Sequence, residues 1–118
     1  MHEISIAQNV IDHVSRVVPP SDLVRVGRIR LRVGIMSGVV AHSLDFCFGA
    51  LTHGTPLEGA TLDIEERPFI VRCRTCKARS TNELGVAVCE ECGSTDTQIE
   101  SGTELDIVHL ELSRQVSP

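Results

Sequence analysis

Four cysteines are the residues of this chain best suited to chemistry. They form two CxxC pairs separated by twelve residues, namely Cys73, Cys76, Cys89 and Cys92. Two such turns can bring four thiolates to the corners of a tetrahedron, which is the geometry of a closed structural zinc site. Such a site leaves no position for water, so the pattern indicates a structural metal rather than a catalytic one. Iron, a redox dithiol and metal-free thiols are the alternatives.

The CxxC turns themselves predict local backbone geometry. Backbone N–H groups in each turn are expected to point at the thiolates and to spread their charge. Gly93 directly follows Cys92, where a tight turn favours left-handed backbone that glycine adopts without strain.

His2 is a second candidate for metal chemistry. An imidazole at position two, beside a free α-amine and backbone nitrogens, can form fused chelate rings. Such an all-nitrogen set suits Ni²⁺ or Cu²⁺ in tetragonal geometry. The alternative is an exposed side chain in a frayed terminus.

The other histidines and the fifth cysteine have ordinary structural explanations. His13, His53 and His109 are expected at the surface or in local hydrogen bonds. Cys47 falls on the apolar stripe of an expected helix, so we expect it in the core. His42 alone is kept as an auxiliary ligand, because its imidazole suits nickel.

Composition limits the functional classes. The chain has 118 residues, 42% of them hydrophobic and 3% aromatic, with a formal charge of −5. Residues 69–99 hold four basic and four acidic side chains, which predicts a poor nucleic-acid surface. No secretory signal and no apolar run of membrane-spanning length is apparent. The odd cysteine count favours a metal site in a reducing cytoplasm over disulfides.

Hydrophobic periodicity predicts two helices and three strands around the cysteine region. The expected helices are 5–18 and 42–52, and the expected strands are 23–34, 61–66 and 104–113. Ser5 is the expected N-cap of the first helix, which Pro19 and Pro20 end. In the last strand, Leu105 and Ile107 would lie on one face and Val108 and Leu110 on the other. This switch predicts a bulge near Ile107.

Alternating arginines mark the strand at 23–34. Arg28, Arg30 and Arg32 share one face, either as an anion or partner surface or as a ladder of ion pairs. We favour the ladder, with the acidic partners Asp63, Glu65 and Glu111.

These elements predict an α+β fold in two layers. A small mixed three-stranded sheet carries two helices, and a zinc-ribbon-like β module is inserted into it. We expect residues 1–68 and 100–118 to form the α/β domain and residues 69–99 the zinc module. The module has too few large apolar residues to fold without a metal.

The chain resembles the HypA/HybF family of nickel metallochaperones over essentially its full length. The resemblance rests on the Met1-His2-Glu3 start, the C-x2-C-x12-C-x2-C pattern and the run Ser43-Leu44-Asp45-Phe46-Cys47-Phe48. Glu58-Gly59-Ala60, Leu62 and Glu65-Glu66 before the first CxxC also match.

The resemblance implies a role for each metal site. His2 would be the nickel ligand, with Glu3 contributing its backbone nitrogen or a neighbouring carboxylate. The four cysteines would hold structural zinc. Members often carry a carboxylate near position 40, where this chain has Val40; His42, Asp45 or the backbone would substitute.

The same resemblance implies a non-enzymatic function. The protein would carry Ni²⁺ in the cytoplasm to the [NiFe]-hydrogenase large-subunit precursor, and in some members to urease. It would work with a GTPase accessory protein, as a monomer or weak homodimer, without nucleic acid or membrane.

Two rival functions follow from the residues alone. One is a zinc-ribbon module that binds nucleic acid or protein and has no nickel role. The other is an enzyme, for which the sequence offers no nucleophile–base set, phosphate loop or open metal site.

Overall fold

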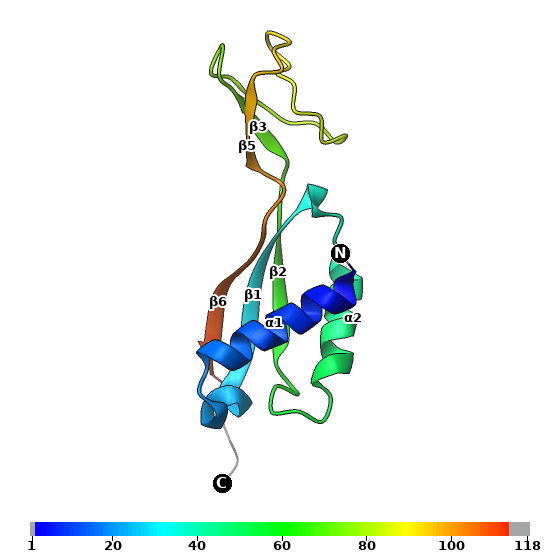
Figure 1. Ribbon diagram of the computed structural model, residues 1–118, viewed down its shortest axis with the longest axis vertical. Helices are drawn as coiled ribbons and strands as arrows, with labels where there is room; N and C mark the ends of the chain where they lie inside the picture. The colour runs from blue at the N-terminus through cyan, green and yellow to red at the C-terminus, as the bar shows by residue number, and fades with distance from the viewer. Residues whose placement is uncertain (1, 114–118) are drawn as a thin grey trace. The chain divides into compact units, whose positions relative to one another are not determined.

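The computed structural model describes residues 2–113, and two α-helices and several short strands make up most of this part of the chain (Figure 1). The elements in chain order are α1 (Glu3–Val17), η1 (Pro20–Arg25), β1 (Val26–Gly34), η2 (Ile35–Ser37), α2 (Ala41–Thr52), β2 (Thr61–Arg67), β3 (Ile70–Cys73), β4 (Arg79–Ser80), β5 (Thr97–Ser101) and β6 (Leu105–Leu112). The predicted α+β class is confirmed.

The chain divides into two compact units. The first, here called the helical unit, comprises Met1–Leu31, Val39–Ile64 and Ile107–Pro118. The second, here called the cysteine unit, comprises Arg32–Gly38 and Glu65–Asp106. The cysteine unit is thus assembled from two separate segments of the chain.

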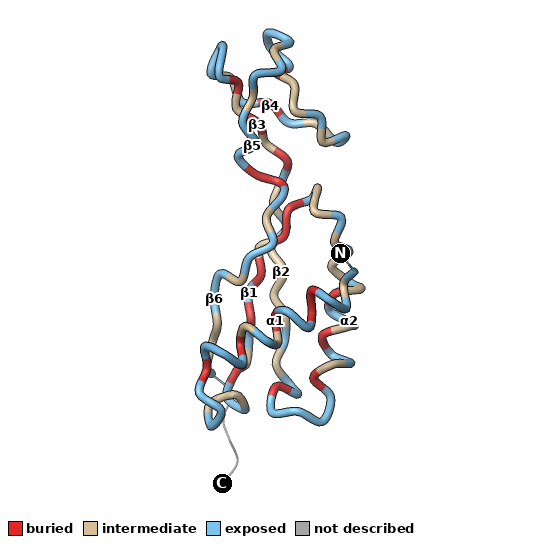
Figure 2. The backbone as a smooth tube through the Cα atoms, viewed as in Figure 1, coloured by how far each residue is buried: buried red, intermediate tan, exposed pale blue. Residues whose placement is uncertain are grey.

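Helix α1 forms because apolar residues recur at helical spacing and give it one buried face. Ile6, Ala7, Val10 and Val14 are buried, while the opposite side is exposed, so colours alternate along it in Figure 2. The helix begins at Glu3, with His2 as N-cap. The predicted cap at Ser5 is therefore wrong, because Ser5 lies within the first turn.

The segment before β1 is helical rather than extended. Residues Pro20–Arg25 form a 3₁₀-helix with proline in its first turn, so the strand predicted from residue 23 begins at Val26. Proline fixes φ near the helical value, which favours a turn there. From Val26 onward the predicted alternation holds, with Ile29, Leu31 and Val33 buried.

Helix α2 confirms the prediction for 42–52 within one residue. Its buried side chains Leu44, Phe48 and Thr52 lie at helical spacing, and the helix packs against α1. Cys47, which we expected in the core, is only half-buried, because it lies at the edge of the buried face.

The first sheet has the strand order β2-β1-β6. Its predicted ladder of ion pairs is confirmed, with nitrogen–oxygen distances of 3.5 Å for Arg28–Glu111, 2.9 Å for Arg30–Asp63 and 3.2 Å for Arg32–Glu65. These half-exposed pairs each contribute about 1 kcal/mol at most. The bulge near Ile107 stays a prediction, and β6 runs unbroken from Leu105 to Leu112.

The cysteine unit contains a second sheet, in the order β4-β3-β5, with both pairings antiparallel. Its buried apolar residues are few and include Phe69, Val71, Cys73 and Cys89. A core this small supports the expectation that a metal must stabilise the unit.

Candidate metal centre

The first CxxC turn follows directly from strand β3. The backbone N–H of Cys76 points at Cys73 Sγ at 3.4 Å, as expected for a turn that stabilises a thiolate. The N–H of Lys77 donates to the Cys73 carbonyl at 3.0 Å, and the N–H of Cys73 donates to the Ala78 carbonyl at 2.9 Å. Lys77 has a φ of 68°, so a residue other than glycine occupies the left-handed position.

The second CxxC turn repeats this geometry. The N–H of Cys92 points at Cys89 Sγ at 3.5 Å. The N–H of Gly93 donates to the Cys89 carbonyl at 3.0 Å, and that of Cys89 to the Ser94 carbonyl at 2.9 Å. Gly93 has a φ of 74°, which confirms its predicted left-handed backbone. The left-handed backbone at Lys77 was not predicted, although Lys77 follows the first CxxC turn as Gly93 follows the second.

The two turns bring all four sulfur atoms together. Their Sγ atoms lie within 4.8 Å of one another, with 3.6 Å between Cys73 and Cys92 and 3.5 Å between Cys76 and Cys89. Zn–S bonds of about 2.3 Å in a tetrahedron give sulfur–sulfur edges of about 3.8 Å. The donor set and its spacing therefore fit a tetrahedral metal ion such as zinc.

The thiols ionise unequally. The Cys76 backbone N–H lowers the pKa of Cys73 to about 6, and the Cys92 N–H likewise lowers the pKa of Cys89. The Ala78 backbone N–H also lowers the pKa of Cys76, but the Cys89 thiol and burial outweigh it and raise that pKa to about 12. Four adjacent thiolates repel one another, so a bound cation is needed to hold all of them in the charged form.

Three arginines near the cysteines form ion pairs with carboxylates of the same unit. Arg72 and Arg79 both contact Glu100, and Arg74 Nη1 lies 3.2 Å from Asp96 Oδ1. This pairing leaves little basic surface for nucleic-acid phosphates around the cysteines.

The predicted nickel residues lie at the start of α1. His2 is exposed, and within the described chain its side chain makes no capping hydrogen bond. Its carbonyl accepts hydrogen bonds from the N–H groups of Ser5 and Ile6. Glu3 opens the first turn and is half-buried. Met1, which carries the α-amine, lies outside the described residues.

Other candidate nickel ligands lie on the first turns of α2. His42 and Asp45 are exposed, and Val40 precedes them as N-cap. Among residues 2–113, the four cysteines form the sole group of three or more metal-binding side chains within ligand distance. Within residues 2–113, His2 therefore has no group of other metal-binding side chains gathered around it.

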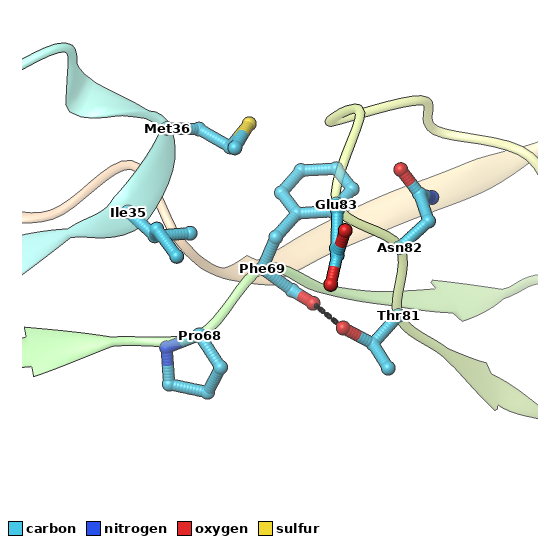
Figure 3. A pocket seen from close by; sticks show the side chains of 7 residues that line it. All are labelled: Ile35, Met36, Pro68, Phe69, Thr81, Asn82 and Glu83. Carbon is cyan, nitrogen blue, oxygen red and sulfur yellow. Dashed lines mark hydrogen bonds between the residues drawn. The ribbon is translucent and has the colours of Figure 1, made fainter.

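The cysteine unit also contains a cavity that the sequence did not reveal (Figure 3). It has a volume of about 530 Å³ and is lined by Ile35, Met36, Pro68, Phe69, Thr81, Asn82 and Glu83. Thr81 Oγ1 donates to the Phe69 carbonyl at 2.6 Å (Figure 3). The lining is mostly apolar and contains a single carboxylate, so it is not suited to hold a metal.

Comparison with known proteins identifies the family. The family described as "Hydrogenase/urease nickel incorporation, metallochaperone, hypA" matches residues 1–112. The chain belongs to the HypA family. The predicted resemblance is thereby confirmed, and with it membership in a family of nickel-incorporation metallochaperones for hydrogenase maturation.

Relatives named hydrogenase maturation factor HypA match nearly the whole chain. The protein from Chloroflexus aurantiacus is 40% identical over 112 residues, covering 94% of this chain and 98% of its own. That from Chlorobaculum parvum is 42% identical over 107 residues, covering 91% and 95%.

Two solution structures share the fold. A HypA protein aligns with a TM-score of 0.64 at 24% identity, covering 95% of this chain and 96% of its own. The Ni metallochaperone HypA from Helicobacter pylori aligns with a TM-score of 0.62 at 23% identity, covering 98% and 100%. In residues 2–113, no helix is long and apolar enough to cross a membrane.

Proposed function

We propose that this protein binds Ni²⁺ at its N-terminus and delivers it for the maturation of [NiFe]-hydrogenase. The observation that carries this proposal is family membership over residues 1–112, together with an exposed imidazole at position two. The protein acts as a carrier and not as an enzyme. Urease is a further client of the same chemistry, since the family description names both.

The start of α1 supports a nitrogen-rich nickel site. The first helical N–H groups have no partner within a helix, and those that bond the His2 carbonyl begin at Ser5. The amides of His2 and Glu3 precede them and can turn toward a metal beside the imidazole. Glu3 contributes its backbone nitrogen or places a carboxylate nearby. Ligand nitrogens must lose their protons to bind, so nickel affinity falls in acid.

His42 and Asp45 are alternative candidates for completing the proposed coordination sphere. Val40 provides no ligand, whereas both of these side chains are exposed at the start of α2. One of them, or further backbone nitrogen, takes the remaining position. We assign nickel binding to residues 1–68 and 100–118.

The four cysteines hold a structural zinc ion in the module at 69–99. Zinc supplies the folding energy that the small apolar core of the cysteine unit lacks. Cys73, Cys76, Cys89 and Cys92 all bind the ion, which leaves no position for a reacting water.

We further propose a cytoplasmic protein that hands nickel to a hydrogenase large-subunit precursor together with a GTPase accessory protein. The paired arginines of the cysteine unit support a role without nucleic acid. The chain works as a monomer or weak homodimer.

Nickel titration by calorimetry tests the N-terminal site. Untagged protein is compared with His2→Ala and with the control His13→Ala, whose histidine lies within α1. We expect His2→Ala to weaken nickel binding by about 100-fold or more, since each 1.4 kcal/mol lost is tenfold, and to retain its zinc. If His2→Ala binds Ni²⁺ as the parent does, the site lies elsewhere and a zinc module without nickel becomes the better function.

A further inference from the structure

Met36 packs its thioether against the loop that joins the two CxxC pairs. A Cβ atom at Gly85 would lie 2.4 Å from Met36 Sδ, so the sulfur fills the space that a side chain at position 85 would need. Gly85 has a φ of 71°, which glycine adopts without strain. The backbone N–H of Met36 donates to the Gly102 carbonyl at 2.8 Å. This bond anchors η2 to the end of strand β5, so the thioether meets the loop from a fixed base.

The loop at residues 82–88, here called the inter-pair loop, lies between strand β4 and the second CxxC turn. The Asn82 side chain closes its first half by hydrogen bonds of 2.7 to 3.0 Å to the backbone of Leu84 and Val86. Cys89 comes directly after the loop. A contact that holds the inter-pair loop therefore also helps to position this metal-binding cysteine.

The Met36 sulfur is accessible to a small neutral molecule. Met36 is half-buried and lines the cavity of about 530 Å³ that also contains the Phe69 ring (Figure 3). Thioethers react with peroxides to form sulfoxides. The mostly apolar lining admits neutral hydrogen peroxide, whereas the Glu83 carboxylate at the same cavity disfavours an anionic oxidant.

We propose that Met36 is an oxidation site, and that its sulfoxide releases the inter-pair loop and speeds the loss of zinc from the cysteines. A lone pair on sulfur attacks one oxygen of hydrogen peroxide, and the O–O bond breaks. The leaving hydroxide takes the proton of the transferred oxygen to form water, so sulfur loses the two electrons that the peroxide gains.

The consequence for the loop follows from the size and polarity of the product. The sulfoxide carries an extra polar oxygen on a sulfur atom that now packs against Gly85. A closely packed contact cannot accept that oxygen without moving apart, so the oxidised side chain and the inter-pair loop separate. This inference rests on the proposed structural zinc and is independent of nickel.

Treatment of the zinc-loaded full-length protein with hydrogen peroxide tests the site. Peptide mass spectrometry distinguishes Met36 from Met1, since the chain has 2 methionines. Hydrogen–deuterium exchange reports on the inter-pair loop, and a chromogenic chelator reports on zinc transfer. Oxidation of Met36 should make both about threefold faster or more. Methionine sulfoxide reductase should reverse both changes, because it reduces the sulfoxide and does not repair oxidised thiolates.

Met36→Leu is the matched control, because leucine keeps an apolar side chain of similar volume but cannot form a sulfoxide. After peroxide treatment it should show neither of the changes that the reductase reverses. Three results would each overturn the proposal: Met36 that stays unmodified at a peroxide concentration that oxidises free methionine, a Met36 sulfoxide without faster loop exchange or without faster zinc transfer, and the same reversible changes in Met36→Leu.

Zinc analysis of the untreated parent separates this inference from the proposed function. A parent that binds no zinc would contradict the structural zinc site. Exchange of the inter-pair loop before and after oxidation would still test whether Met36 holds the loop.

Discussion

The two candidate metal sites differ in how much of each the chain assembles by itself. The backbone of the cysteine unit aims four thiols at one point, with N–H groups already directed at Cys73 and Cys89. His2, by contrast, is exposed at the beginning of α1, and residues 2–113 gather no side-chain cage around it. A preformed closed site retains its metal, whereas a site with few fixed ligands binds and releases its metal readily.

Removal of the proposed structural zinc should have the largest effect. A chelator or Cys89→Ser should unfold the cysteine unit, because its small core cannot replace the metal. Helices α1 and α2, which belong to the helical unit, should persist. Zinc analysis measures the loss of the metal, and far-ultraviolet circular dichroism measures the helix content that remains. Cys47→Ser is the control that should keep its zinc.

If the amides of the cysteine unit stay protected from hydrogen exchange after complete metal removal, the prediction that this unit unfolds without its metal is wrong. The unit would then be stable on its apolar core alone.

Blocking the N-terminus should affect the other site alone. One extra residue before Met1 displaces the α-amine from the His2 imidazole, so nickel affinity should fall by about tenfold or more. Zinc content should not change. Calorimetry beside the untagged parent measures this, and equal nickel affinity in the two proteins would place the α-amine outside the coordination sphere.

A methyl group at Gly34 tests how rigidly the cysteine unit is built. A Cβ at this position would lie 2.1 Å from the Gly102 carbonyl carbon, so Gly34→Ala should reduce the free energy of unfolding by about 1–3 kcal/mol. Gly49→Ala, where the Cβ meets open space, should be neutral or slightly stabilising. Equal urea midpoints for the two variants would argue that the strands separate easily.

Glu104 should give the smallest effect, visible as a dependence on pH. Burial raises its pKa, but hydrogen bonds from backbone N–H groups and the Ser101 hydroxyl outweigh it and lower the pKa below 4.5. A lowered pKa contributes stability above the unfolded value that is lost as the pH falls through the folded value. Glu104→Gln should therefore cost about 1 kcal/mol near neutral pH and progressively less in acid. Urea unfolding at several pH values measures this difference, and a constant difference would contradict it.

The cysteine cluster and the helices were predictable because each depends on local spacing. The CxxC pattern determined which four side chains meet, and helical periodicity located both α-helices. The N-cap was not predictable in this way, since Ser5 has the preferred chemistry but helix α1 begins at Glu3. The 3₁₀-helix at Pro20–Arg25 was likewise not predicted. It directly precedes strand β1, and the expected strand was extended back over its last residues.

Other features required three-dimensional information. The cavity beside Phe69 brings together residues from η2 and from the chain after β4, and no periodic pattern connects those segments. The exposed Phe46 belongs to the same apolar run as the core residues, so composition could not assign it to the surface. The proposed nickel site would include the Met1 amine, which lies beyond the described residues.

Each CxxC turn contributes one buried and one exposed sulfur. Cys73 and Cys89 are buried, whereas Cys76 and Cys92 are exposed. A competing chelator in solution therefore meets one thiolate of each turn first and displaces it while the buried pair still holds the ion. The two buried sulfurs would then hold the ion together with donor atoms of the chelator, so the rate of metal exchange should depend on the concentration of the attacking ligand as well as on spontaneous dissociation.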